Sequence, residues 1–364
     1  MLDNLLNGLP RANARPVRAR TQSVDRLAEF DDFGPNPGAL AAHVHVPDGI
    51  KPGAALVVVL HGCTQTAAAY DQGAGWSVLA DAHGFALLFP EQRRPNNASL
   101  CFNWFEPGDT TRGEGEVASI AAIVDAVVAR HAIDPARVFV TGLSAGGAMA
   151  GAMLATYPER FAGGAIIAGL PYGVAGNVQQ ALGAMRLGTG ERAQGLADRV
   201  RAASPHRGPW PSLSIWHGTA DHTVAVGNAD AVVRQWAGVH GLGAPTATET
   251  VDGQTRTVWR DAGGRVLIED WRIAGMAHGT PVAGAVLGVA GAYMLEAGIS
   301  STRHIAEFWG VAPKAMRAQD PAAARFSRTR RLTPEPLAAR AGQARPAGVA
   351  AVIDSALRKA GLLG

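Results

Sequence analysis

The chain has 364 residues, of which 47% are hydrophobic and 17% charged, and its formal net charge is +3. This length and apolar fraction suffice for one large hydrophobic core. With only two cysteines, Cys63 and Cys101, the chain can form neither a disulfide framework nor a four-cysteine zinc site. The positive charge is mild and no basic motif is interleaved with aromatic residues, so we expect no nucleic-acid partner.

The first 40 residues are expected to form an N-terminal extension. Residues 1–20 lack the uninterrupted apolar run of roughly 7–15 residues that a signal peptide needs, so we expect no ordinary signal peptide. A bridge between the two cysteines would favour an oxidising compartment instead. The sequence therefore leaves the compartment open.

Five short apolar runs predict buried strands. Their apolarity is continuous rather than alternating, which is typical of parallel strands covered by helices on both faces of a sheet. The runs are residues 55–62, 85–90, 137–142, 164–169 and 213–218.

Helical patterns lie between these strands. Val117, Ile120 and Val124 recur at helical spacing and give one apolar stripe within residues 116–134. Two other segments carry stop signals, Gly84 after residues 76–83 and Pro158 after residues 144–157. The alternation of strands and helices predicts an α/β sandwich with right-handed crossovers.

The last third of the chain changes character twice. Residues 255–261 and 265–273 flank Ala262–Gly264 and predict an antiparallel pair at the sheet edge. Residues 279–298 are rich in Gly and Ala and contain Pro281, so we expect buried or loop-lining structure and no transmembrane segment. Residues 311–364 are rich in Ala, Arg and Pro and predict a tail ending in a short helix. The main domain is then expected over residues 41–310.

A Gly-x-Ser-x-Gly motif stands at the end of the third predicted strand. Gly142, Ser144 and Gly146 follow that strand directly and precede a predicted helix, the context of a nucleophile elbow. The serine hydroxyl would project from the sheet edge near the positive end of the helix. Such pentapeptides are common, and a glycine-rich turn with an incidental serine is the alternative.

A serine nucleophile needs an acid and a histidine, which follow it in that order in this type of site. Asp221 comes just after the strand over residues 213–218, and His278 follows the run over residues 265–273. We expect His278 to accept the Ser144 proton and Asp221 to orient the imidazole.

Other residues compete for these roles. His217 and His222 lie within four residues of Asp221 at one strand end, so neither is well placed to join that acid to Ser144; we expect a structural role for His217. Asp270 is a rival acid, but it lies within a strand-like run rather than after one.

Stabilising the charge that develops in acyl transfer requires backbone donors. The residue after the serine, Ala145, should supply one N–H, and the loop after an earlier strand should supply another. Cys63 follows His61-Gly62 at such a strand end and is the candidate, although His-Gly can also be a simple turn.

Six ordered motifs complete this pattern: LHGCTQTAAAY, CFNWF, RGEGEVASI, DPARVFVTGLSAGGAMA, HGTADHTV and HIAEFWG. Together, over residues 43–310, the chain resembles the poly(3-hydroxybutyrate) depolymerase family esterases, which are related to feruloyl and acetylxylan esterases. The resemblance implies an α/β-hydrolase fold, a Ser144–Asp221–His278 triad, and an oxyanion hole at Cys63 and Ala145. The sequence contains no H-E-x-x-H motif and no Cys/His cluster, so we expect no metal and no other cofactor.

The same resemblance implies a Cys63–Cys101 disulfide beside the site and a substrate-lining role for Trp104. Two free thiols and a core tryptophan are the respective alternatives. The stretch after His278, AHGTPVAGAVLG, departs from the GHAWSGG-like form of many relatives, and the tail is too short for a separate polymer-binding domain. These departures concern the natural polymer more than the ester chemistry.

The sequence thus predicts a serine esterase acting on short-chain 3-hydroxyalkanoate esters, oligomers or polymer through an acyl-enzyme. A feruloyl or acetyl esterase on plant-derived esters is the first alternative. A non-catalytic protein bound to polymer granules and a peptidase are weaker ones.

Overall fold

The computed structural model describes residues 26–284 and 287–313. The predicted extension over residues 1–40 and the predicted tail over residues 311–364 therefore lie mostly outside the described residues, as does the short helix expected at the C-terminal end.

A ten-stranded sheet forms the centre of the molecule, with the strand order β1-β2-β4-β3-β5-β6-β7-β10-β9-β8. The six strands from β4 to β10 in that order are parallel to one another, and β1, β2, β9 and β8 are antiparallel to their neighbours. The strands are β1 (Ala28–Glu29), β2 (Ala41–His45), β3 (Leu56–Leu60), β4 (Ala86–Glu91), β5 (Val138–Leu143), β6 (Gly163–Ile167), β7 (Ser212–Gly218), β8 (Ala247–Val251), β9 (Gln254–Arg260) and β10 (Val266–Ile273).

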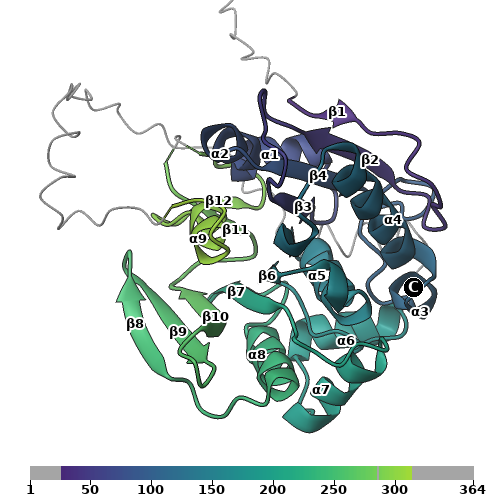
Figure 1. Ribbon diagram of the computed structural model, residues 1–364. Helices are drawn as coiled ribbons and strands as arrows, with labels where there is room; N and C mark the ends of the chain where they lie inside the picture. The colour runs from purple at the N-terminus through teal and green to yellow at the C-terminus, as the bar shows by residue number, and fades with distance from the viewer. Residues whose placement is uncertain (1–25, 285–286, 314–364) are drawn as a thin grey trace, which may run out of the picture.

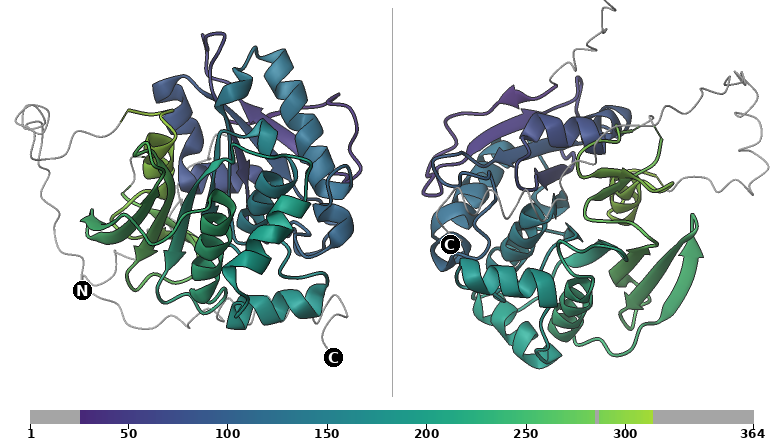
Figure 2. Two further views of the ribbon diagram at one scale, coloured as in Figure 1. Left: turned by 60° about the horizontal axis from the view of Figure 1, so that its bottom comes forward. Right: turned by 180° about the vertical axis from the view of Figure 1, so that it is seen from behind.

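The five predicted parallel strands are confirmed as β3, β4, β5, β6 and β7. Every residue of β3, β5 and β6 is buried, since helices cover both faces of the sheet. One apolar cluster lies between the sheet and α4, α5, α6, α7 and α8, and the other between the sheet and α1, α2 and α9. Figures 1 and 2 show the sheet between these layers. The predicted α/β-hydrolase architecture is confirmed.

The helices of the described residues include the three predicted from their apolar stripe or stop signals, which are α2, α4 and α5. Gly84 caps α2 in the left-handed conformation, as its position suggested. The helices are α1 (Ala67–Ala74), α2 (Trp76–His83), α3 (Pro107–Thr110), α4 (Gly115–Arg130), α5 (Ala145–Thr156), α6 (Val178–Leu187), α7 (Ala193–Ala202), α8 (Gly227–His240) and α9 (Ser301–Phe308).

The predicted antiparallel pair is confirmed as β9 and β10, but it is part of a larger unit. β10 also pairs in parallel with β7, and β8, which was not predicted, forms the outer edge. In Figures 1 and 2 the green β8–β9 ribbon projects from the body of the molecule.

The Gly/Ala-rich stretch over residues 279–298 carries a small two-stranded sheet of β11 (Thr280–Val282) and β12 (Met294–Glu296). Across residues 26–284 and 287–313, no helix combines the length and the apolarity that a membrane crossing requires.

Helix α5 is buried along its whole length, including every residue from Ala145 to Thr156. Its glycines and alanines allow the helix to lie close against the sheet: the nearest atom to a Cβ added at Gly147 would be the carbonyl oxygen of Gly142 or Ile167, each at 3.0 Å. This helix begins immediately after Ser144, so its packing fixes the position of that residue.

Candidate active site

The predicted nucleophile, Ser144, occupies the turn between β5 and α5. Its backbone φ of 57° lies in the left-handed region, which is unusual for a residue other than glycine and is favoured only where the surroundings enforce it. Here the Ser144 N–H donates a hydrogen bond of 2.9 Å to the carbonyl of Ile167, at the end of β6. The conformation is that of a nucleophile elbow.

The two motif glycines are required by close backbone approaches. A Cβ at Gly142 would lie 2.3 Å from the carbonyl oxygen of Gly146, and a Cβ at Gly146 would lie 2.3 Å from that of Leu60. Neither distance is compatible with a side chain. The pentapeptide is therefore a structural requirement of this turn and not a chance pattern.

His278 and Asp221 are brought together by a tight contact between two loops. A Cβ at Gly218, the last residue of β7, would lie 2.2 Å from the carbonyl oxygen of Met276, so only glycine allows this approach. The Ala220 N–H then donates to the same Met276 carbonyl at 3.0 Å. His278 Nδ1 consequently lies 2.7 Å from Asp221 Oδ2.

The Asp221 carboxylate is buried and well supplied with donors. Its Oδ1 accepts hydrogen bonds from the N–H groups of Thr223 at 2.8 Å and Val224 at 2.9 Å. Burial alone would raise the pKa of Asp221, but the contacts with His217 and His278 outweigh burial and hold that pKa well below its usual range. Asp221 therefore stays ionised and can orient an imidazole.

Ser144 and His278 line one cavity of about 240 Å³. Among the described residues, a hydrogen bond joins His278 to Asp221, but none joins Ser144 Oγ to His278. Catalytic hydrogen bonds are often longer in proteins without substrate and shorten when it binds, so this arrangement remains compatible with proton transfer.

The cavity has two principal walls. The loop wall comprises residues 62–65 and 96–105, and the helix wall comprises Leu170 and one face of α6. Tyr293, next to β12, contributes to the lining near His278. The lining residues from the helix wall are Leu170, Val178, Ala181, Leu182 and Met185.

A disulfide joins Cys63 and Cys101 within the loop wall, with their Cα atoms 4.2 Å apart, and this confirms the pairing that the family resemblance implied. The Thr64 N–H also donates to the Ser99 carbonyl at 2.7 Å. Thr64 has a φ of 65°, a strained value for a β-branched residue. The two loops that make this wall are thus tied together at adjacent positions.

Cys63 and Ala145, whose backbone N–H groups are the predicted oxyanion donors, both line the cavity. Neither N–H donates a hydrogen bond within the described part of the chain; for Ala145 this follows from its place at the start of α5. The His61 imidazole accepts from the Gln92 N–H at Nε2, so its Nδ1 carries the proton and donates to the Gly62 carbonyl at 2.8 Å. The Gly62 carbonyl and the Cys63 N–H belong to the same trans peptide unit and point in opposite directions. The bond from His61 therefore also fixes the direction of the Cys63 N–H.

Trp104 is 9% exposed and borders the cavity. Its ring makes an edge contact with Phe105, whose centroid is 5.5 Å away. Trp104 therefore belongs both to the apolar core and to the cavity lining, and its contact with substrate stays a prediction.

The rival residues lie elsewhere. His222 is exposed and His217 is buried, and neither borders the cavity. Asp270 lies within β10, where its Oδ2 accepts a hydrogen bond of 2.8 Å from Arg272 Nε. None of the three can reach a substrate at Ser144 from these positions.

Sequence reasoning missed the helix wall and the support of the loop wall. Val178, Ala181, Leu182 and Met185 recur at positions i, i+3, i+4 and i+7, a pattern that predicts an amphipathic helix and could have been recognised. The buried Glu116 accepts hydrogen bonds from Gln92 Nε2 and from the Asn103 N–H, which ties α4 to the loop wall. No local pattern marks Glu116 as buried.

Within the described ranges, no group of three His, Cys, Asp or Glu side chains is arranged to hold a metal ion. The cavity therefore offers a hydroxyl at a strained turn, an imidazole paired with a carboxylate, and two backbone N–H groups that donate no hydrogen bond within the described residues.

The mostly parallel sheet with a nucleophile elbow after β5 defines an α/β-hydrolase. Its architecture is similar to that of the acetyl xylan esterase from Aspergillus awamori, with a TM-score of 0.67, 25% identity, and coverage of 79% of this chain and 99% of that chain. Residues 41–259 match the family model of the esterase PHB depolymerases.

The chain belongs to the esterase PHB depolymerase family. It is 46% identical over 297 residues to poly(3-hydroxyalkanoate) depolymerase C of Paucimonas lemoignei, which covers 80% of this chain and 72% of that protein. It is 35% identical over 266 residues to an acetylxylan esterase of Coprinopsis cinerea, covering 71% and 70% respectively. The chain is accordingly a carboxylic ester hydrolase.

Proposed function

We propose that this esterase hydrolyses short-chain 3-hydroxyalkanoate esters, as oligomers or polymer, through an acyl-enzyme formed on Ser144. The observation that carries the proposal is the meeting of the elbow serine and the carboxylate-paired His278 in one apolar cavity. The 46% identity to a poly(3-hydroxyalkanoate) depolymerase supports the substrate class.

In the proposed mechanism the Ser144 hydroxyl attacks the ester carbonyl carbon, and its proton passes to Nε2 of His278. Asp221, which stays ionised, stabilises the imidazolium that results. The carbonyl oxygen becomes negatively charged in the tetrahedral intermediate and accepts hydrogen bonds from the N–H groups of Cys63 and Ala145.

Collapse of this intermediate breaks the bond to the alcohol oxygen, which takes the proton from His278. A water molecule then attacks the acyl-enzyme, with His278 as the base, and the acid product leaves as Ser144 recovers its proton. Each proton that leaves an attacking oxygen is thereby returned to a leaving oxygen.

The cavity lining supports a neutral, compact acyl group. The cavity lining contains His278 and the phenol of Tyr293 but no Asp, Glu, Lys or Arg side chain that could pair with a charged substrate. The Asn97 side chain is already engaged, because its amide donates to Asn103 and its oxygen accepts from the N–H of Ser99. Trp104, Leu170 and Met185 supply apolar surface for a short aliphatic chain.

An acetyl ester on a plant polysaccharide is the second candidate substrate. It is supported by the 35% identity to an acetylxylan esterase and by the similarity of fold to another. Since both substrates present a small neutral acyl group, the proposed site would process either one, and the alcohol side of the ester distinguishes them.

The test is product analysis after incubation with 3-hydroxybutyrate oligomers, amorphous polymer, acetylated xylan and methyl ferulate. We expect hydroxybutyrate monomers or dimers from the first two. Turnover of acetylated xylan or ferulate with the hydroxybutyrate substrates untouched would reject the proposed substrate class and leave the esterase chemistry standing.

A further inference from the structure

His217 is a buried histidine that the proposed mechanism does not use. It lies near the end of β7, is 1% exposed, and has no access to the cavity. Burial of an imidazole is unfavourable unless its polar atoms are bonded, so the partners of this ring require an explanation.

The His217 ring has two polar neighbours on its Nε2 side. Nε2 lies 2.8 Å from the carbonyl oxygen of Val224 and 3.4 Å from Asp221 Oδ2. A carbonyl oxygen can only accept, so Nε2 must carry the proton. The tautomer of His217 is therefore fixed, and its N–H is directed at the turn that presents Asp221.

The turn that His217 contacts is also hydrogen-bonded to Asp221. The N–H groups of Val224 and Thr223 both donate to Asp221 Oδ1, and the Val224 carbonyl accepts from His217. These two N–H groups fix Oδ1, His217 fixes the turn, and Oδ2 faces His278 at 2.7 Å. Removing His217 would free the Val224 carbonyl and leave it buried without its donor.

We propose that His217 is a positioning residue for the catalytic acid: its Nε2–H holds the Val224 carbonyl, and with it the turn that directs Asp221 Oδ2 at His278. This inference rests on the proposed function, because it assigns a role to a residue that acts through Asp221. His217 contacts neither substrate nor the reacting atoms.

The charged groups around His217 come from the turn after β7, from β10 and from α8. Arg272 of β10 lies opposite His217 in the parallel register of β7 and β10. Arg272 pairs with Asp270 and Asp230, and Asp270 Oδ1 is buried without a hydrogen-bond partner in the described part of the chain. His217 thus has the Asp221 carboxylate near its Nε2 and Arg272 opposite it on the neighbouring strand.

The first test compares His217→Gln with His217→Leu. Glutamine can place an amide N–H near the position of Nε2, whereas leucine offers no donor. We expect His217→Leu to lower kcat on a chromogenic short-chain ester by about 10- to 100-fold with little change in KM, and His217→Gln to recover most of the loss. His222→Leu, on the exposed histidine of the same turn, is the matched control and should behave as wild type.

The second readout is the pH profile of kcat/KM, which a merely structural role would not shift. Without the donor at the turn, the Asp221–His278 pair should hold its proton more tightly, because the carboxylate has lost part of its stabilisation. The acid limb of the profile in His217→Leu should therefore move to higher pH, while that of His222→Leu should not.

A third measurement needs no impaired variant and covers the case in which His217→Leu does not fold. In the wild-type protein labelled with ¹⁵N-histidine, the resonances that disappear in His217→Gln should show a proton on Nε2. An Nε2 without a proton would overturn the proposal. So would folded His217→Leu with wild-type kcat, or equal impairment of the Gln and Leu variants with an unshifted acid limb.

Failure of the proposed function would give a different result. If Ser144→Ala retained full esterase activity, the assignment of the site itself would be wrong, whatever the His217 variants did. Loss of activity in Ser144→Ala together with wild-type behaviour of His217→Leu would reject only the role of His217.

Discussion

The two ends of helix α5 differ in the way that they are held. At the N-terminal end, Ser144 has a left-handed backbone conformation, and carbonyl oxygens of Leu60 and Gly142 approach the first turn so closely that only small residues fit. The Ala145 N–H donates no hydrogen bond within the described residues, and Ser144 and Ala145 line a cavity.

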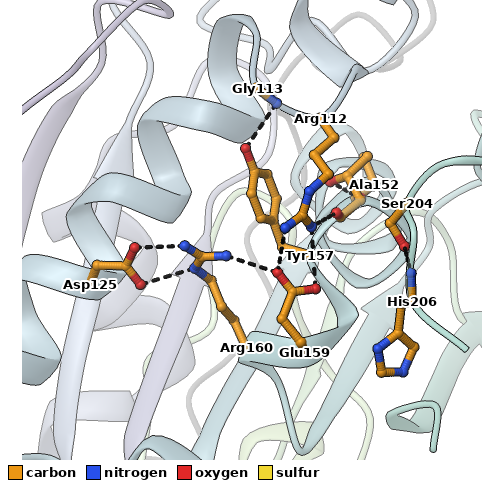
Figure 3. Close-up of polar contacts among 10 residues, drawn as sticks. Arg112, Gly113, Asp125, Ala152, Tyr157, Glu159, Arg160, Ser204 and His206 are labelled. Atoms are coloured by element: carbon orange, nitrogen blue, oxygen red, sulfur yellow. Dashed lines mark hydrogen bonds and ion pairs between the residues drawn. The ribbon is translucent and has the colours of Figure 1, made fainter. Parts of the chain in front are cut away.

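At the C-terminal end, the side chains of Arg112, Tyr157, Glu159 and Arg160 form a network of ion pairs and hydrogen bonds, as Figure 3 shows. The guanidinium carbons of Arg112 and Arg160 lie 4.5 and 4.8 Å from the ring centroid of Tyr157. Both arginines also pair with Glu159, and Arg160 bonds Asp125 of α4 through two nitrogens. Tyr157 itself accepts from the Gly113 N–H.

The difference separates chemistry from stability along one helix. Strain and unpaired donors at the N-terminal end are unfavourable to folding but are what an acyl-transfer site requires. The closed network at the other end anchors the helix and contacts no part of the cavity. Substitutions at the first end should therefore affect turnover, and those at the second end only stability.

The largest expected effect is that of Ser144→Ala. Loss of the hydroxyl should lower kcat on a chromogenic short-chain ester by about 10⁴-fold or more, because no acyl-enzyme can form. The free energy of unfolding, measured in urea, should change little, because the elbow conformation is imposed by its surroundings. Retention of turnover would contradict the assignment of the nucleophile.

Gly146→Ala tests the close packing at the same end. The added Cβ would lie 2.3 Å from the Leu60 carbonyl oxygen, so β3 or α5 must shift, and we expect a loss of about 2–4 kcal/mol of stability together with most of the activity. Gly151→Ala is the matched control, because a Cβ there would make ordinary contacts with Ile166 Cδ1 at 3.4 Å and the Leu170 carbonyl oxygen at 3.9 Å. That helix-interior change should be neutral or stabilising by up to about 1 kcal/mol.

The elbow and the parallel strands could be predicted from sequence because each depends on local signals. Continuous apolar runs mark β3, β5 and β7, and the glycines around Ser144 mark a turn that admits no side chain. Asp221 and His278 could be paired because each follows a strand and the fold brings these strand ends together. Their 2.7 Å contact has no local signal, since it depends on Gly218 and Met276 meeting across two loops.

The far end of α5 shows what sequence could not supply. Tyr157, Glu159 and Arg160 read as an ordinary polar segment after a helix stop, and Arg112 and Asp125 lie more than 30 residues earlier. Their pairing is a tertiary event without periodicity or a motif. The edge strand β8 was missed for a similar reason, because its exposed residues lack a buried face.

Glu116 makes the stability of the folded protein depend on pH. It lies on α4, the helix that also contacts the C-terminal end of α5 through Asp125. Burial, with a smaller contribution from Asp109, raises the pKa of Glu116 to about 8. Between about pH 5 and 8 the unfolded chain has released this proton and the folded chain still holds it. Raising the pH through this window should therefore lower the free energy of unfolding, by up to about 4 kcal/mol.

Urea unfolding at pH 5, 6, 7 and 8 checks this expectation. Glu116→Gln should flatten the slope, because glutamine carries no proton to lose, and Glu114→Gln, on the exposed neighbour, should leave it unchanged. Equal slopes in all three proteins would mean that Glu116 is not the group that titrates.

Removing the Cys63–Cys101 disulfide tests whether the loop wall depends on a covalent crosslink. The double variant Cys63→Ala, Cys101→Ala removes the crosslink and keeps the Cys63 backbone N–H. We expect a loss of about 2–4 kcal/mol of stability and a fall in kcat that exceeds the change in KM, because the wall that presents this N–H becomes less rigid. Wild-type kcat at a temperature where the variant is folded would show that the Thr64–Ser99 hydrogen bond alone is sufficient.

The smallest expected effect belongs to the C-terminal end of α5. Arg160→Met removes the bonds to Asp125 and Glu159 and one cation–π contact, and keeps much of the aliphatic packing; we expect a loss of about 1 kcal/mol of stability, since these pairs are partly exposed. Arg265→Met, at an exposed pair in the β9–β10 turn, should cost less and serves as the control. Both variants should keep wild-type kcat and KM, because neither side chain touches the cavity. A reduced kcat in Arg160→Met alone would mean that the anchored end of α5 also sets the position of Ser144, and that the two ends of this helix are coupled.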